Sequence, residues 1–403
     1  MKRILFFLLL VLSFVPLCAQ QHSFIRYHDN RLDYADRSAS LDRFFERWQR
    51  MVATGQGNIN IVHIGGSHVQ AGTLSNAIRQ RLLHDNPTLV ADRGMLFPYS
   101  AAARCNNPAD YRVRCPQKVS LTRNVYKEYP NPLGLCGISV TAADSTTEVA
   151  IALRDSTIDY ATSSIVVLGH SDQNVIPHLL IGPRTVFPSY IDPRTDRFIF
   201  NLVRPTDSFT VVLPCRKGQL FALTGIYLAN RRPGFSFHSI GVNGAAVPDF
   251  LRCQHFTRDL RLLHPDLVVF GIGINDASKS DFDTAEFRHN YLALVDSIRS
   301  VNPDCAFIFI SNNDSFRKLG RRKYQVNRNG LLARDVFRRL ALDTDGALWD
   351  QFHIMGGLSS MERWQRAKLA QADRVHFTHA GYLLLGDLFY EALAEAYRKH
   401  KHR

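Results

Sequence analysis

A serine follows two glycines at the end of an apolar run, in the segment Asn58–Gln70 that reads NINIVHIGGSHVQ. Gly65 and Gly66 can bend the chain sharply and expose the next side chain, because glycine adopts backbone torsions that other residues avoid. Apolar residues of Thr73–Leu83 recur at helical spacing, so the unit is predicted to be strand, tight turn and helix. Backbone N–H groups at such a turn can face a developing negative charge. Ser67 is therefore a candidate nucleophile, and a plain helix cap is the equal alternative.

A candidate base lies in the segment DRVHFTHAGY, where Asp373 precedes His376 by three residues at the start of the last predicted helix. At this spacing a carboxylate can hold one imidazole nitrogen and leave the other to accept a serine proton. A core histidine beside a capping aspartate would show the same pattern. Asp373, His376 and His379 could also ligate a metal, but no fourth ligand is apparent, so the sequence predicts neither a metal nor a cofactor.

Two further segments contain groups that could stabilise an oxyanion. Gly244, in SIGVNGAA, follows a short apolar strand and could offer an unobstructed backbone N–H. Asn275 and Asp276, in VVFGIGINDA, follow a buried strand, and an amide there can donate to charge that appears only in a transition state. A turn glycine and an Asx turn are the alternatives. All these segments end predicted strands, which is where open α/β sheets bind ligands.

The elements that must position these residues follow from hydrophobic patterning. The chain has 403 residues, of which 45% are hydrophobic and 21% charged, as expected for a globular protein with substantial cores. Outside the middle third, apolar strands alternate with amphipathic helices, which predicts a three-layer α/β fold with a mainly parallel sheet. The strands are Asp266–Gly271, Ala306–Ser311 and one near Leu348, and the helices are Thr284–Val301, Asn327–Leu342, Met361–Gln371 and Ala380–Tyr397.

The pattern changes between about Arg104 and Arg232, where every second residue is apolar. The alternating sets are Val149, Ile151 and Leu153, then Phe198, Phe200 and Leu202, then Phe209, Val211 and Leu213. This period predicts an inserted antiparallel module resembling a β-sandwich. The predicted division is therefore an α/β domain at 20–103 and 233–403, with the β module at 104–232.

The N-terminus matches a secretory signal peptide. Lys2 and Arg3 precede the apolar run Ile4–Cys18 and the small residue Ala19. We therefore expect cleavage of residues 1–19 and a periplasmic or extracellular protein, with lipidation at Cys18 as the minor alternative. No other apolar run is long enough to span a membrane.

Six cysteines follow the predicted signal peptide, an even number that an oxidising compartment could pair. A Cys105–Cys115 bridge is the favoured single pairing, and buried thiols are the alternative. None forms a C-x-x-C pair of the kind found in zinc sites. The six are Cys105, Cys115, Cys136, Cys215, Cys253 and Cys305.

The net charge of +13 indicates attraction to acidic surfaces. The basic residues are scattered, apart from the tract Arg321-Arg322-Lys323 and the tail Arg398–Arg403. For an exported protein the acidic partners would be cell-wall polymers, anionic lipid headgroups or acidic polysaccharides. No nucleic-acid recognition motif is present, so nucleic acid is not a predicted partner. Nothing in the sequence indicates an oligomeric state.

With these residues assembled, the chain resembles the SGNH hydrolases, the GDSL-type esterase and lipase superfamily. The four blocks occur in the family's order, over Asn58–Tyr99 and Phe235–Tyr397. The resemblance implies a flavodoxin-like hydrolase fold and a serine esterase that uses a catalytic triad. Position by position it matches Ser67 to the nucleophile, Asp373 and His376 to the D-x-x-H pair, and Ser67, Gly244 and Asn275 to the oxyanion hole.

Within the superfamily, His68, the following Val69-Gln70-Ala71 and the β insertion resemble exported bacterial peptidoglycan and polysaccharide O-acetylesterases. This narrower resemblance implies hydrolysis of O-acetyl esters on an acylated polysaccharide such as peptidoglycan, and a carbohydrate-binding insert. His68 and Asp276, beside the nucleophile and the amide, are candidate substrate-binding residues.

One position departs from the family, because Gly66 stands where an aspartate usually precedes the nucleophile. The departure keeps open a non-catalytic polysaccharide-binding protein with a decayed hydrolase domain. A lipid or aryl esterase is the other alternative, and it would require an apolar groove beside Ser67.

Overall fold

The main sheet of the computed structural model has seven strands in the order β1-β21-β18-β17-β2-β16-β3. The structure describes residues 22–403 except 36, 103–104, 155–157, 231, 322 and 403, so the predicted signal peptide lies outside the described residues. All neighbouring strands pair in parallel except β1 with β21, which confirms the predicted sheet type. The strands are β1 (Leu32–Asp33), β2 (Asn58–Gly65), β3 (Val90–Asp92), β16 (Gly234–Gly241), β17 (Leu267–Gly271), β18 (Ala306–Ile310) and β21 (Ala347–Trp349).

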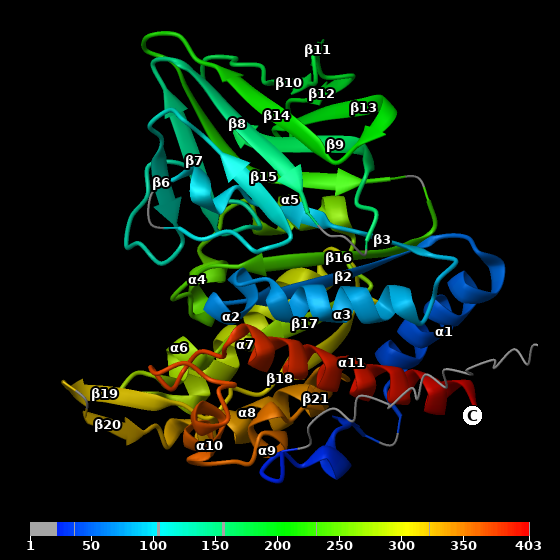
Figure 1. The fold of residues 1–403 in the computed structure, drawn as a ribbon, viewed down its shortest axis with the longest axis vertical. Coiled ribbons are helices and arrows are strands. Elements are labelled where there is room, and N and C mark those ends of the chain that lie inside the picture. Colours follow the sequence, from blue (N-terminus) through cyan, green and yellow to red (C-terminus); the bar gives the residue numbers. More distant parts are fainter. Residues whose placement is uncertain are drawn as a thin grey trace, which may run out of the picture.

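Helices cover both faces of this sheet (Figure 1). Along β17, Leu267 and Val269 pack into the core beneath one helical layer, whereas Val268 and Phe270 pack into the other. Successive side chains of a strand point to opposite faces, so a continuous apolar run is what a sheet covered on both sides requires. One layer holds α1 (Ala39–Thr54), α3 (Thr73–His84) and α11 (His379–Lys401), and the other holds α4 (Val247–Leu251), α5 (Phe256–Leu263), α7 (Thr284–Arg299) and α8 (Asn329–Asp343).

The helix boundaries agree closely with the periodicity except near Met361. There α10 (Ser360–Arg366) ends before Ala367, and Lys368 has a left-handed φ of 59° that cannot continue the helix. Two elements were not predicted from the hydrophobic pattern. They are α1 and the hairpin of β19 (Phe316–Gly320) and β20 (Lys323–Val326). Within the described residues, no helix combines the length and the apolar character needed to cross a bilayer.

Two antiparallel sheets form the predicted β module, at the top of Figure 1. The core of the module continues without a break into the helical layer of α4 and α5. Its strands run from β5 to β15, but β4 (Gly94–Leu96), which precedes them, also pairs with β15. One sheet has β5 (Tyr111–Arg114), β8 (Thr146–Leu153), β10 (His178–Ile181), β11 (Arg184–Val186) and β14 (Ser208–Pro214), and the other has β4, β6 (Ser120–Arg123), β7 (Ile138–Ala143), β9 (Thr162–His170), β12 (Tyr190–Asp192), β13 (Arg197–Thr206) and β15 (Leu220–Ala229).

A buried ionic cluster joins the β module to α3. Asp110, just before β5, lies 2.6 Å from Arg93 Nε and 3.4 Å from Arg79 Nη1. The side chains of both arginines are at most 2% exposed. Arg79 also donates to the Tyr160 hydroxyl at 2.9 Å and to the Phe237 carbonyl at 3.1 Å. One carboxylate therefore balances two guanidinium groups that have no access to water.

Replacing Asp110 with alanine should lower the free energy of unfolding by about 3–5 kcal/mol, because it leaves buried positive charge uncompensated. Urea denaturation followed by circular dichroism measures this change. The control is Glu395→Ala, which breaks an exposed pair with Lys399 and should cost less than about 1 kcal/mol. Equal effects of the two substitutions would show that the cluster does not contribute to joining the layers.

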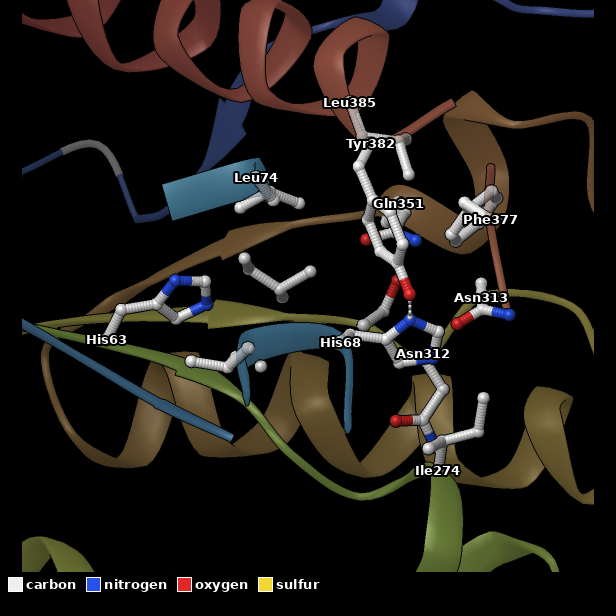
Figure 2. Close-up of a pocket in the computed structure, with 14 residues that line it drawn as sticks. His63, His68, Leu74, Ile274, Asn312, Asn313, Gln351, Phe377, Tyr382 and Leu385 are labelled. Atoms are coloured by element: carbon white, nitrogen blue, oxygen red, sulfur yellow. Dashed lines mark hydrogen bonds between the residues drawn. The ribbon is translucent and has the colours of Figure 1, made fainter. Parts of the chain in front are cut away.

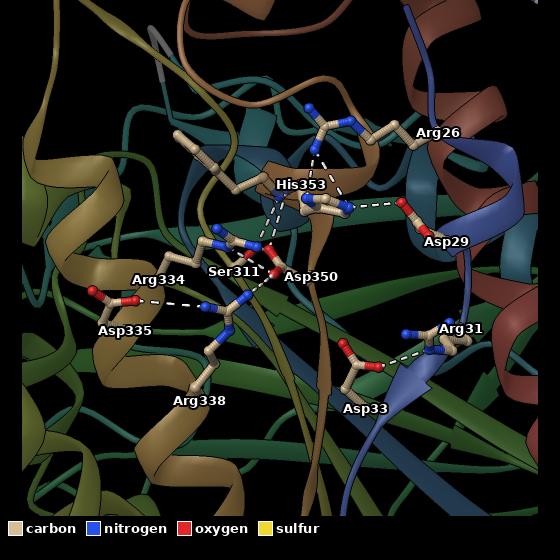
Figure 3. A network of polar contacts seen from close by, with 11 residues as sticks. Arg26, Asp29, Arg31, Asp33, Ser311, Arg334, Asp335, Arg338, Asp350 and His353 are labelled. Atoms are coloured by element: carbon tan, nitrogen blue, oxygen red, sulfur yellow. Dashed lines mark hydrogen bonds and ion pairs between the residues drawn. The ribbon is translucent and has the colours of Figure 1, made fainter.

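The start of the described chain is fixed beside the end of β21 by the network in Figure 3. Asp350 directly follows β21, is buried, and accepts hydrogen bonds from Arg334 Nε at 2.7 Å and Arg338 Nη2 at 3.2 Å. It also caps α9 (Gln351–Ile354) by accepting from the backbone N–H of His353. The His353 ring in turn pairs with Asp29 at 2.8 Å, so the network connects α8, α9 and the start of the described chain.

The cysteine prediction is corrected by the structure, in which all six cysteines of the described residues are free thiols. Cys105 is buried and its Sγ accepts from Gln70 Nε2 at 3.5 Å. Cys115 lies beyond the extended strand β5, with its Sγ donating to the Gln117 carbonyl at 3.6 Å. The Cys105–Cys115 bridge is therefore wrong, because the two thiols have separate partners on either side of a strand.

Candidate active site

Ser67, His376 and Asp373 form a continuous chain of hydrogen bonds. Ser67 Oγ lies 2.7 Å from His376 Nε2, and His376 Nδ1 lies 2.7 Å from Asp373 Oδ2. A carboxylate can only accept a hydrogen bond, so the proton of the neutral ring must be on Nδ1. Nε2 is then left to accept the serine proton. The sequence-predicted nucleophile, base and orienting carboxylate are thus brought together, although Ser67 and His376 are 309 residues apart.

The environment of Asp373 keeps its carboxylate ionised. Partial burial tends to raise the pKa of Asp373, but hydrogen bonds from the His376 ring and from the backbone N–H groups of His376 and Val375 lower it to about 2. Those backbone groups donate to Oδ1 at 3.0 and 2.9 Å, so Oδ2 is free to hold the ring. The carboxylate therefore stays charged wherever an imidazole can act as a base.

The strand register explains why residues from three distant segments meet. Gly65, the last residue of β2, is aligned with Gly241 of β16 on one side and with Gly271 of β17 on the other. Three parallel strands thus end level, and their following loops share one edge of the sheet. Ser67 begins α2 (Ser67–Gln70) at this edge.

The two remaining oxyanion candidates line the same cleft as Ser67. Gly244 has a left-handed φ of 85°, which favours glycine at this turn. Asn275 lies in α6 (Ile274–Ala277), and its Nδ2 donates to the Ala245 carbonyl at 2.9 Å. Since the amide nitrogen carries two hydrogens, this bond fixes the Asn275 side chain and leaves one donor for a ligand.

Gly66 allows the nucleophile turn to approach the oxyanion loop closely. A Cβ atom at this position would lie 3.3 Å from Asn275 Nδ2 and 3.6 Å from the Ala245 carbonyl oxygen. The contact with Asn275 is tight for a side chain, whereas the contact with Ala245 is an ordinary van der Waals distance, so an aspartate would have to share this space with Asn275. The glycine that departs from the family pattern is therefore compatible with an assembled site.

Gln70 is a positioning residue that sequence reasoning did not single out. Its side chain is 3% exposed; Oε1 accepts from the backbone N–H of Asn243 at 2.8 Å, and Nε2 donates to the Asn106 carbonyl at 3.3 Å. Asn243 directly precedes Gly244, and Asn106 belongs to the loop that leads into β5. Gln70 thus connects the nucleophile helix to two other walls of the cleft. The feature that could have indicated this role is a glutamine side chain on the buried face of α2.

The cleft has a volume of about 460 Å³, and most of the residues that line it have polar side chains. Ile274, Val375 and Tyr382 supply apolar surface near the triad. The rest of the lining is dominated by carboxamide residues, which are Gln70, Asn106, Asn107, Asn243, Asn275 and Gln371.

Comparison with known proteins agrees with this geometry. Residues 207–384 match the family model of the GDSL-like lipase/acylhydrolases, a range that includes Gly244, Asn275, Asp373 and His376 but begins after Ser67. The chain carries a GDSL-like acylhydrolase domain. A search of curated proteins by sequence finds no significant match.

The chain also resembles solved structures. A peptidoglycan O-acetylesterase matches 91% of this chain and 99% of its own length, with a TM-score of 0.75 and 19% identity. An acetyl xylan esterase matches 39% of this chain and 81% of its own length, with a TM-score of 0.32 and 20% identity. A lipase/acylhydrolase from Enterococcus faecalis matches 40% of this chain and 77% of its own length, with a TM-score of 0.31 and 23% identity. The domain match, with the fold shared with the first of these, identifies an ester hydrolase of the SGNH fold.

The structure places the two predicted substrate-binding residues outside the cleft lining. His68 faces a separate cavity of about 30 Å³, where its Nδ1 lies 2.8 Å from the Tyr382 hydroxyl, as Figure 2 shows. Asp276 is 6% exposed and accepts from the backbone N–H of Val247 at 3.2 Å. The structure therefore does not support substrate contact by His68 or Asp276. His68 borders the triad on the side of the separate cavity, and Asp276 fixes the start of α4.

His68 is expected to remain uncharged beside the catalytic base. Burial, followed by the nearby His376, lowers the pKa of His68 to about 3, and the two ring centroids are 5.2 Å apart. The ring signals of His68 in a ¹H–¹³C correlation spectrum should therefore not move between about pH 5 and 8, since the free side chain titrates near pH 6.5. A His68→Gln variant assigns the signal, and a titration midpoint near 6.5 would contradict the burial of this ring.

Proposed function

We propose that this protein is an exported serine esterase that removes O-acetyl groups from a cell-wall or other polysaccharide such as peptidoglycan. The observation that carries the proposal is the Ser67–His376–Asp373 chain of hydrogen bonds at a cleft lined by six carboxamide residues. The peptidoglycan O-acetylesterase with the same fold supports this substrate class. Export rests on the sequence of residues 1–19.

The proposed mechanism is a two-step acyl transfer. His376 takes the proton of Ser67 as its oxygen attacks the ester carbonyl, and Asp373 stabilises the imidazolium that forms. The tetrahedral intermediate collapses when His376 returns that proton to the departing sugar oxygen. Water, activated by the same imidazole, then hydrolyses the acyl-serine and releases acetate.

Charge on the carbonyl oxygen would be stabilised by the backbone N–H groups of Ser67 and Gly244 and by the free amide hydrogen of Asn275. Each such donor contributes on the order of 3 kcal/mol to transition-state stabilisation in acyl-transfer enzymes. The hydrogen bond from Asn275 to Ala245 keeps the amide oriented before the charge appears, so little reorganisation is needed during the reaction.

The polarity of the cleft favours a glycan over a lipid. Carboxamides donate and accept hydrogen bonds at once, which suits sugar hydroxyl groups, whereas an acyl chain needs a continuous apolar groove. Here the apolar residues beside Ser67 are outnumbered by carboxamide residues; the larger of them are Ile274, Val375 and Tyr382. A small acyl group such as acetyl fits this limited surface.

A substrate series tests the proposal directly. Purified protein should release acetate from O-acetylated peptidoglycan, and should hydrolyse p-nitrophenyl acetate much faster than the butyrate and octanoate esters. Acetylated xylan distinguishes a general glycan esterase from one selective for peptidoglycan. Preference for octanoate would favour the lipid esterase. Retention on peptidoglycan without hydrolysis of any ester would favour the binding protein that Gly66 keeps open.

Gln70 should affect turnover more than binding. Gln70→Ala removes the hydrogen bonds to the Asn243 N–H and the Asn106 carbonyl, each of which contributes about 0.5–1.5 kcal/mol. If the oxyanion loop relaxes, kcat for p-nitrophenyl acetate should fall about 10- to 100-fold with little change in KM.

Two further variants control this experiment. Gln70→Glu keeps the acceptor for Asn243 and should restore part of the rate, whereas Gln56→Ala removes an exposed glutamine and should have no effect. A kcat within twofold of wild type for a folded Gln70→Ala protein would show that Gln70 does not position the loop.

A further inference from the structure

The β19–β20 hairpin carries a concentration of positive charge that the triad does not use. Lys318, Arg321 and Lys323 are exposed near its tip, within the basic tract noted in the sequence. None of the three forms an ion pair with another residue that the structure describes. Figure 1 shows the hairpin projecting from the body of the protein beside α6.

One side of the hairpin stem is fixed to the loop that carries the catalytic base. The backbone N–H of Phe316 donates to the Arg374 carbonyl at 3.2 Å. The Arg374 guanidinium lies over the rings of Phe316 and Tyr324, at 5.0 and 5.3 Å from their centroids. Arg374 directly follows Asp373, and it is held further by an ion pair with Glu362 at 2.8 Å. The stem therefore packs against the base loop.

The other side of the stem is fixed to the helix that carries the oxyanion amide. Arg317 Nη2 donates to the Lys279 carbonyl at 2.7 Å, just beyond α6. Asn327, which follows β20, donates from Nδ2 to the Ala277 carbonyl at 3.0 Å. The hairpin is thus anchored between the segment of His376 and the segment of Asn275.

These contacts determine the direction in which the hairpin presents its positive charge. A two-stranded hairpin is marginally stable on its own, so its contacts with the base loop and with α6 fix its direction. Both of those segments line the cleft, so the hairpin that carries Lys318, Arg321 and Lys323 projects from the part of the molecule that holds the cleft (Figure 1). Exposed charges attract a polyanion over roughly 8 Å at physiological ionic strength.

We propose that this hairpin is a docking arm for a glycan that bears carboxylate groups. The glycan would place its hydroxyl groups against the carboxamides of the cleft and its carboxylates against Lys318, Arg321 and Lys323. This inference rests on the proposed esterase function and specifies its substrate as an anionic polymer. An anionic membrane is the competing partner for a cationic hairpin, but the carboxamide lining of the adjoining cleft favours a glycan.

The test compares two triple variants with the same change in charge. Lys318→Gln/Arg321→Gln/Lys323→Gln removes the charge of the arm. Arg50→Gln/Lys399→Gln/Lys401→Gln removes exposed charge from α1 and α11. The C-terminal ends of these helices lie on the side of Figure 1 opposite to the hairpin. The substrates are p-nitrophenyl acetate, acetylated xylan, O-acetylated peptidoglycan fragments with free carboxylates, and the same fragments after amidation of those carboxylates.

The arm variant should raise KM for the carboxylated fragments roughly tenfold at low salt, because exposed ion pairs each contribute modestly. It should leave p-nitrophenyl acetate, xylan and the amidated fragments within twofold of wild type. Salt at 0.5 M should remove the difference from wild type, as screening requires. The control variant should behave like wild type throughout.

Three outcomes would overturn the docking arm. These are an unchanged KM for the carboxylated fragments, an equal loss on the amidated fragments, and charge-dependent binding to phosphatidylglycerol vesicles in place of the glycan. Failure of the proposed esterase function is distinguishable, because it would appear in wild type as absence of p-nitrophenyl acetate hydrolysis. In that case, sedimentation of the two variants with carboxylated and amidated peptidoglycan still tests the arm.

Discussion

Replacement of Ser67 with alanine is expected to lower kcat for p-nitrophenyl acetate by on the order of 10⁵- to 10⁶-fold, as for other acyl-transfer enzymes that lose their nucleophile. The reason is that Ser67 Oγ, which lies 2.7 Å from His376 Nε2, can pass its proton to the imidazole and form the acyl intermediate, whereas alanine has no nucleophilic atom. The fold should be unaffected, since alanine is compatible with the start of α2. Single-turnover assays with the ester measure the loss.

His376→Ala should lose about as much activity, and the double variant hardly more, because the two groups act as one unit. Ser300→Ala, an exposed serine at the end of α7, is the matched control and should retain full activity. Additive losses in the double variant, or a rate near wild type in either single variant, would show that these residues do not form a catalytic pair.

The second large effect is expected from Asp373→Asn, with a loss of about 10⁴-fold in kcat. Asparagine keeps an oxygen to accept from the backbone N–H groups of Val375 and His376, so the loop should remain folded. However, its amide would donate to Nδ1 of His376 and force the proton onto Nε2. The ring would then present a donor to Ser67 and could not accept its proton.

The pH dependence distinguishes this tautomer effect from loss of structure. Hydrogen bonds lower the pKa of Asp373 to about 2, so in wild type no loss of activity from protonation of this carboxylate is expected above about pH 4. The asparagine variant should be impaired at every pH. Asp335→Asn, at an exposed position, is the control. A loss of less than tenfold would show that Asp373 does not set the tautomer.

Much of the fold could be predicted from sequence because its signals are local. The continuous apolar run at Leu267–Gly271 is what a strand covered on both faces requires. Alternation at Phe209 and Val211 indicated a strand with one buried face, and both side chains are buried in the β module. The departures at Met361 and at the β19–β20 hairpin depend on turns and packing that periodicity does not record.

The meeting of the candidate site residues could be inferred only as a set. No segment distinguished a nucleophile from a helix cap; the structure shows that Gly65, Gly241 and Gly271 end their strands level. That register cannot be read from any one strand. For the same reason the sequence could not place Ser67 at 2.7 Å from a base 309 residues away.

The residues that sequence reasoning missed act through long-range contacts. Gln70 became informative only when its partners Asn243 and Asn106 were known. His68 and Asp276 have site-like positions in the sequence, yet they lie outside the cleft lining because the short helices α2 and α6 direct neighbouring side chains to different sides. Cys105 and Cys115 are close in sequence but are separated by a strand.

The central claim is that Ser67 is a nucleophile activated by His376, and covalent labelling tests it most directly. A fluorophosphonate probe should add once to wild type, and peptide mass spectrometry should map the adduct to Ser67. The Ser67→Ala protein should not be labelled, and the His376→Ala protein should be labelled far more slowly. An active wild-type protein that is labelled at another residue, or that is not labelled at all, would contradict the claim.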